Sequence, residues 1–158
     1  MERFLPAMAM PVLRLFPIAV VLLAGCAADV VSPGTAVQLT GAQEVPPVTT
    51  SATGTGRITV SPDRAVSGDV TTAGVAGTAA HIHEAALGKN GPVVIPLSKT
   101  SDATWTVQAG AKLSESQYAS YKAGNLYVNV HSTAQLGGEI RGQIKPPVEA
   151  EPTRRYGY

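Results

Sequence analysis

Hydrophobic and polar residues alternate over short stretches of this chain, and turn residues separate one stretch from the next. In the run Leu126–His131, the Leu and two Val residues fall on one face of an extended strand, while Tyr, Asn and His fall on the other. This period of two is typical of strands with one buried face. It predicts eight strands, near Val37–Thr40, Gly54–Val60, Ala65–Thr72, Ala79–Glu84, Val93–Leu97, Thr104–Val107, Leu126–His131 and Glu139–Ile144.

One segment carries helical signals instead. Ser114 can cap the first turn of a helix, and Gln117, three residues on, completes the pattern of a capping box. Gly124 is placed to end the helix. We therefore expect a short helix over about Ser114–Lys122. Eight short strands at near-regular spacing with one helix predict an all-β fold, an antiparallel β-sandwich.

The N-terminal residues 1–25 differ from the rest and have the form of a lipoprotein signal peptide. Arg3 and Arg14 precede the apolar run Leu15–Ala24, which is shorter than the roughly 20 residues needed to span a bilayer. The run ends at Leu23-Ala24-Gly25-Cys26, which resembles the lipobox of bacterial lipoproteins and implies lipidation of Cys26. The alternative is a buried Cys at the end of an ordinary apolar helix.

Three further segments follow the predicted signal peptide. We expect residues 26–36 to form a tether, residues 37–144 to form the domain, and residues 145–158, which are rich in Pro and charge, to be a disordered C-terminal tail. Cys26 is the sole Cys, so its lipidation would leave the domain without a disulfide. We expect an exported protein that is lipid-anchored to the cell envelope. Ala27 after the Cys favours the outer membrane.

Composition excludes several classes of function. From Cys26 onward the chain has ten Lys and Arg residues against ten Asp and Glu residues, without a basic patch, so nucleic acid is not an expected partner. No phosphate-binding loop or Gly-x-Ser-x-Gly nucleophile motif occurs. A hydrolase is therefore not indicated.

The three histidines carry the clearest chemistry. His81 and His83 share one face of a predicted strand, and His131 ends another. Three imidazoles without a Cys or a carboxylate pair favour a copper site over a closed structural zinc site. Glu84 falls on the opposite face from His83 and is a poor fourth ligand. The alternative is a cluster of histidines that make hydrogen bonds and bind no metal.

Five ordered motifs in the domain resemble the CHRD domain, which was named from chordin and also occurs singly in bacteria. The motifs are Gly41–Pro47, Ala80–His83, Asn90–Val94, Tyr127–His131 and Gly138–Ile144. The family has no generally established biochemical activity. The resemblance therefore implies a binding or structural module and leaves its ligand open.

The order of the histidines is also similar to that in copper–zinc superoxide dismutase. By this resemblance His81, His83 and His131 would hold copper, and Arg141 would steer an anion toward it. The sandwich would then be dismutase-like; otherwise it would be immunoglobulin-like. The chain lacks a fourth, bridging His, a zinc loop and a disulfide, so zinc and full dismutase chemistry are not supported.

Two functional hypotheses remain from the sequence. The first is a non-catalytic binding or structural module that holds a protein or glycan partner at the envelope, with the membrane contacted through the lipid anchor. The second is a copper-binding protein for storage, delivery or superoxide defence; an enzyme, if it is one, would be dismutase-like.

Glu44 and Arg141 are either a ligand-facing pair, or a fold-supporting ion pair or surface charges. A distance above about 10 Å from His131 to the other rings would end the copper hypothesis, because metal–nitrogen bonds are only about 2 Å long.

Overall fold

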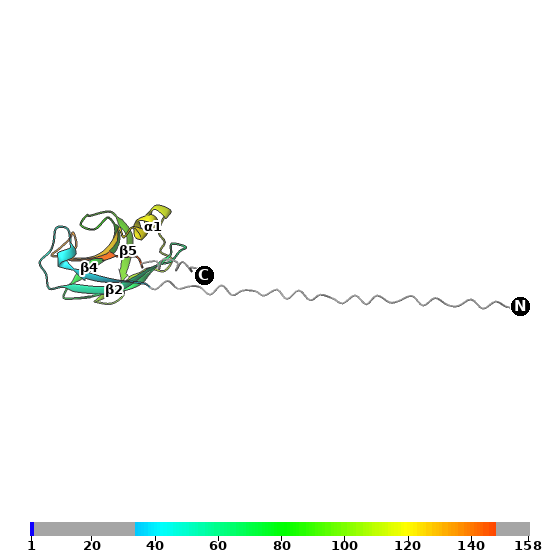
Figure 1. The fold of residues 1–158 in the computed structure, drawn as a ribbon. Coiled ribbons are helices and arrows are strands. Elements are labelled where there is room, and N and C mark those ends of the chain that lie inside the picture. The colour runs from blue at the N-terminus through cyan, green and yellow to red at the C-terminus, as the bar shows by residue number, and fades with distance from the viewer. Residues whose placement is uncertain (2–33, 148–158) are drawn as a thin grey trace, which may run out of the picture. The chain divides into compact units, whose positions relative to one another are not determined.

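A computed structural model describes Met1 and residues 34–147, and in that part of the chain eight strands and one α-helix surround a single core (Figure 1). The elements are β1 (Thr35–Thr40), a 3-10 turn (Gly41–Gln43), β2 (Thr53–Val60), β3 (Val66–Ala73), β4 (Gly77–Glu84), β5 (Val93–Lys99), β6 (Thr104–Val107), α1 (Glu115–Lys122), β7 (Leu126–Ser132) and β8 (Ile140–Ile144). The predicted all-β class and the strand positions are confirmed.

The strands form a closed antiparallel barrel in the order β1-β2-β3-β6-β5-β4-β7-β8, so the predicted sandwich is wrong. β1 pairs with β2 along its whole length, and at its end Thr40 pairs with Arg141 of β8. That contact joins the first and last strands and leaves no free sheet edge. Strand spacing cannot distinguish the two architectures, because both use short antiparallel strands with one buried face.

Aliphatic side chains from all eight strands fill the barrel, and Trp105 is the one large aromatic residue from the strands within it. The alternate residues of β7 that face inward, Leu126, Val128 and Val130, are at most 1% exposed. Ala80 and Ile82 of β4 are equally buried beside them. The predicted apolar face of each histidine-bearing strand is therefore the core face.

Helix α1 begins as its sequence predicts. The Ser114 hydroxyl accepts a hydrogen bond from the Gln117 backbone N–H, and the Gln117 side chain accepts one from the Ser114 N–H. This capping box satisfies backbone groups that a helix start otherwise leaves unpaired. Tyr121 anchors the helix to the core, and Gly124 follows it with a left-handed φ of 74°.

The outer faces of β7 and β8 are also buried, which the alternation did not predict. Tyr127 and Asn129 are 3% and 2% exposed, and Arg141 is 1% exposed. The β4–β5 connection contributes to this cover, because the Arg141 guanidinium donates to the Lys89 carbonyl and to the Asn90 side chain. A second, polar layer of buried side chains thus lies outside the apolar core.

The predicted signal peptide, the tether before Gly34 and the tail after residue 147 lie outside the described residues. β1 begins at Thr35, so the last two residues of the predicted tether belong to the barrel. Among the residues that the structure describes, no helix has the length and apolar character to cross a membrane.

Candidate metal centre

Strands β4 and β7 are hydrogen-bonded neighbours, and their register brings the three histidines together. Ala79 pairs with His131 and His81 pairs with Asn129, so His131 lies diagonally across from His81. The ring centroid of His131 is 4.9 Å from that of His81 and 6.2 Å from that of His83. One possible ligand atom from each histidine lies within 4.8 Å of the others. The predicted cluster is confirmed as a geometric fact.

Two of the rings are held by backbone carbonyls. Nδ1 of His83 lies 3.0 Å from the Gly91 oxygen, and Nδ1 of His131 lies 2.9 Å from the Leu136 oxygen. A carbonyl oxygen only accepts, so in each ring Nδ1 carries the hydrogen and Nε2 keeps its lone pair in the neutral form. Metal-binding histidines characteristically donate their second N–H in this way.

The remaining nitrogens point toward a common space. Nε2 of His131 lies 3.0 Å from Nδ1 of His81, a hydrogen-bond distance. Nε2 of His83 is buried and has no hydrogen-bond partner. A buried polar atom without a partner is uncommon and needs an explanation, such as a water or an ion. A metal bound by these three nitrogens would satisfy it, so the residues present fit a metal.

The environment keeps two of the rings neutral. Burial lowers the pKa of His81, and the neighbouring charges of His131 and His83 lower it further. Burial also lowers the pKa of His83, partly offset by its hydrogen bond to Gly91 and by the side chain of Asn129. Neutral imidazole is the form that binds metal, because the proton and the metal compete for the same lone pair.

The group of residues that could hold a metal contains no carboxylate and no thiol in the part of the chain with described coordinates. The Glu84 side chain accepts a hydrogen bond from Ser120 of α1, away from the histidines, in agreement with its predicted face. An all-imidazole set of three does not match the closed four-ligand sites of structural zinc. It leaves a coordination position open.

A family model described as the CHRD domain matches residues 35–144, most of the chain. The chain belongs to the CHRD family. No curated protein matched this chain. No solved structure matched it either. The likeness to copper–zinc superoxide dismutase therefore stays a likeness of motif order alone.

In this CHRD domain an aromatic side chain that sequence reasoning did not single out supports the site. The Tyr127 ring stacks on His83, with centroids 4.9 Å apart and planes 7° from parallel. The Arg141 guanidinium lies 3.4 Å from the centre of the Tyr127 ring. Because β7 lies between β4 and β8, Tyr127 separates the histidine from the arginine. The alternation of β7, which puts Tyr127 on the face of His131, was the signal that could have identified it.

The placement of Arg141 favours a structural role. Its guanidinium makes two hydrogen bonds to the β4–β5 connection, of 2.8 Å to Lys89 and 3.2 Å to Asn90. The side chain is 1% exposed, whereas an anion-steering group must be reachable from solvent. The guanidinium thus holds the β4–β5 connection against the barrel and packs against the Tyr127 ring.

Glu44 is buried as well, at 5% exposure, so surface charges are the wrong description of Glu44 and Arg141. Its Oε1 atom has no hydrogen-bond partner. Burial raises the pKa of this carboxyl from 4.5 to about 7, although the charge of Arg141 acts in the opposite direction. Gly138, at φ 130°, makes room for the carboxyl, because a Cβ there would lie 2.4 Å from Oε1 and 2.6 Å from Nδ2 of Asn129. No salt bridge within 4.0 Å joins Glu44 to Arg141 among the described residues.

Proposed function

We propose that this CHRD domain is a non-catalytic binding module whose ligand is a single copper ion held by His81, His83 and His131. The observation that carries the proposal is the convergence of three imidazoles, two of which already direct the hydrogen on Nδ1 to a backbone carbonyl. Nδ1 of His83 and of His131 face backbone carbonyls, so Nε2 of each is available. Nδ1 of His81 donates a hydrogen bond to Nε2 of His131 at 3.0 Å, and it would become the third ligand when its hydrogen moves to Nε2 of the His81 ring.

Copper fits this donor set better than the other common metals. Imidazole suits copper and zinc, but magnesium and calcium require oxygen ligands. Copper also stands at the top of the affinity order of divalent first-row metals for nitrogen sites. Because His81 and His131 are partly exposed, an ion could be exchanged with solvent or a partner. The proposed roles are copper storage or delivery.

A copper titration of the full domain tests the proposal. Wild-type protein should bind one copper per chain, and the electron paramagnetic resonance spectrum of Cu(II) should show nitrogen coupling from imidazole. His131→Ala should weaken copper binding by more than about 100-fold and change the nitrogen coupling, while circular dichroism stays unchanged. Thr71→Ala, an exposed position on β3, is the matched control and should behave as wild type. Copper binding by His131→Ala as tight as that of wild type, or no binding by wild type, would contradict the proposal.

We further propose that the domain is exported and anchored to the envelope, in the outer membrane, through lipid on Cys26. The support is the apolar run followed by a lipobox-like tetrapeptide at the sole Cys of the chain. Cys26→Ser should leave the protein unprocessed or release it in soluble form. If that variant fractionates with membranes at the size of the wild type, the anchoring proposal fails and the copper proposal is unaffected.

A further inference from the structure

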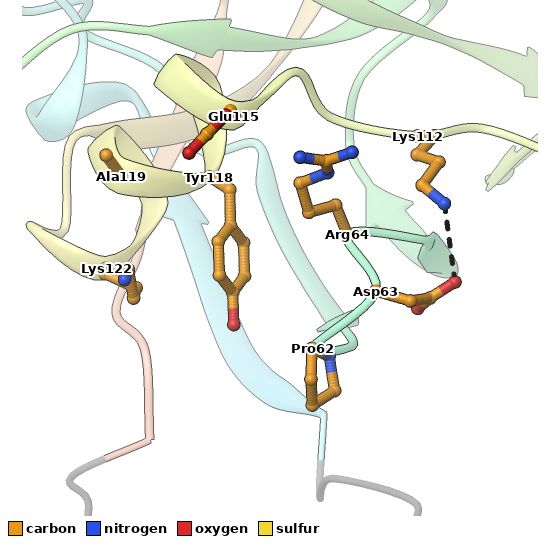
Figure 2. A pocket seen from close by; sticks show the side chains of 8 residues that line it. All are labelled: Pro62, Asp63, Arg64, Lys112, Glu115, Tyr118, Ala119 and Lys122. Atoms are coloured by element: carbon orange, nitrogen blue, oxygen red, sulfur yellow. Dashed lines mark ion pairs between the residues drawn. The ribbon is translucent and has the colours of Figure 1, made fainter.

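A second site lies away from the histidines, between the β2–β3 turn and α1, and we call it the turn–helix pocket (Figure 2). Its volume is about 560 Å³, within the range of small-molecule sites. Tyr118 of α1 forms one side, and Asp63 and Arg64 of the turn form the other. The full lining is Pro62, Asp63, Arg64, Lys112, Glu115, Tyr118, Ala119 and Lys122.

Backbone hydrogen bonds hold the two sides in place. The Leu113 N–H donates to the Arg64 carbonyl at 3.0 Å, and the Val66 N–H donates to the Ala111 carbonyl at 2.9 Å. These bonds join the turn to the segment that leads into α1, and the capping box at Ser114 orients the helix itself. The pocket is therefore formed in the folded domain and does not depend on a ligand for its shape.

Arg64 is in an unfavourable local position in two respects. Its φ is 74°, in the left-handed region that Gly and Asn tolerate better than a long side chain. Its Nε atom is buried and makes no hydrogen bond. Among the described residues, the one salt bridge links Lys112 to Asp63 at 3.6 Å and does not involve Arg64. The left-handed backbone is held by hydrogen bonds, since the Arg64 N–H donates to the Ser61 carbonyl at 2.8 Å, but nothing in the folded domain pairs with Nε, and a buried donor without a partner calls for an explanation such as a ligand.

We propose that the turn–helix pocket binds an acidic saccharide, with a sugar ring beside Tyr118 and a sugar carboxylate on Arg64. The lining supports this class over simpler ligands. Three cationic side chains donate and two carboxylates accept, which suits hydroxyl groups that both donate and accept. A bare inorganic anion would meet the carboxylates of Asp63 and Glu115, and a bare cation would meet Arg64 and two lysines. The Tyr118 ring, with Lys122 Nζ 5.1 Å from its centre, adds a wall of apolar and cationic contact for a sugar ring and its carboxylate.

Trigalacturonic acid is a suitable probe, and its fully methyl-esterified form is a matched neutral control. Titration of 15N-labelled domain should shift the backbone amide signals of the turn and of α1. The acid should bind at least about tenfold more tightly than the ester, the size expected for a charge-assisted contact. Inorganic phosphate should bind more weakly than the acid. Phosphate binding as tight as that of the acid would overturn the saccharide assignment, and so would the absence of shifts at millimolar acid.

Variants then test the role of Arg64. Arg64→Asn removes the guanidinium but suits the left-handed backbone, so binding should weaken about tenfold while Tm does not fall. Tyr118→Leu should also weaken binding, and Lys89→Gln, which removes an exposed cation outside the pocket, should leave it unchanged. The proposal is overturned if Arg64→Asn binds as wild type, if it lowers Tm, or if Lys89→Gln weakens binding equally. Copper binding should be the same in all these variants, so this test is independent of the metal proposal.

Discussion

The histidine cluster and the turn–helix pocket differ in the elements that position their polar side chains and in how far those side chains are exposed. The histidines project from neighbouring hydrogen-bonded strands, and backbone carbonyls hold two of their rings within 3.0 Å. The pocket is built on a turn and a helix. Both side chains of its one ion pair, Lys112 and Asp63, are at least half exposed. Strand register thus suits a small ligand such as a metal ion, whereas a turn beside a helix suits a larger, charged one.

Carboxyl groups near the two sites show the same contrast. Burial raises the pKa of Glu44, which packs beside Asn129 on the outer face of the barrel. Asp63 in the pocket is exposed, and a hydrogen bond from the Ser61 hydroxyl lowers its pKa. Desolvation therefore sets the direction of the pKa shift beside the histidine cluster, and hydrogen bonding at an exposed position sets it in the turn–helix pocket. The predictions below test that difference.

The largest expected effect is on copper affinity. Replacement of any one of His81, His83 or His131 by Ala should weaken copper binding by a similar factor. That factor should exceed the roughly 10–100-fold cost typical of losing an outer-shell partner. Copper affinity should also fall at acid pH, because protons then compete for the ligand nitrogens, and the fall should begin below the ordinary histidine value near 6.5 because the pKa values of His81 and His83 are lowered. Competition with a copper chelator at several pH values measures both effects. If one of the three variants binds copper as tightly as wild type, the replaced histidine is not a ligand.

The next effect is on the pH dependence of folding. The Glu44 carboxyl titrates near 7 when folded and near 4.5 when unfolded, so between these values the folded state holds more protons. Its contribution to the free energy of unfolding therefore decreases as pH rises from about 4.5 to above 7, by about 3 kcal/mol in total.

Glu44→Gln removes this titration and should be more stable than wild type at pH 8.5, with a smaller or reversed difference at pH 4. Urea unfolding of both proteins at the two pH values measures it. The difference between the two proteins isolates Glu44, because the depressed pKa values of His81 and His83 are common to both. A difference that does not change with pH would contradict the burial argument.

Arg141→Lys should lower the free energy of unfolding by about 2 kcal/mol, because an ammonium cannot both stack on Tyr127 and keep two directed hydrogen bonds. Thermal and urea unfolding measure this loss. Copper affinity should fall less than in a histidine variant, since Arg141 supports His83 through Tyr127 and Lys keeps the positive charge that also acts on His83. A variant as stable as wild type would show that the buried guanidinium does not hold the loop.

The smallest effect is expected in the turn–helix pocket. Lys112→Ala breaks the exposed ion pair with Asp63, and pairs of this kind contribute little to the free energy of unfolding. The loss should shrink further when salt is raised, because screening weakens exposed charges. Urea unfolding at low and high salt provides the measurement. A loss as large as that in Arg141→Lys would mean that the pocket is held by charge after all.

The sequence alone determined the local features of this protein. Period-two alternation located the strands, the Ser114–Gln117 pair located the start of α1, and strand geometry put His81 and His83 on one face. Each of these follows from residues close together in the chain, whose relative positions are set by backbone geometry. The five ordered motifs also identified the CHRD domain.

Only the tertiary structure decided how the strands pair and what covers them. The alternation of β1 and β8 is the same in a barrel as in a sandwich, and the Thr40–Arg141 pairing that closes the barrel joins distant segments. His131 reaches His81 through the β4–β7 register, which the motif order implied but local pattern could not establish. Burial of Glu44, Tyr127 and Arg141 likewise depends on loops that fold over the barrel. These features arise from contacts between residues far apart in the chain, so no local periodicity encodes them.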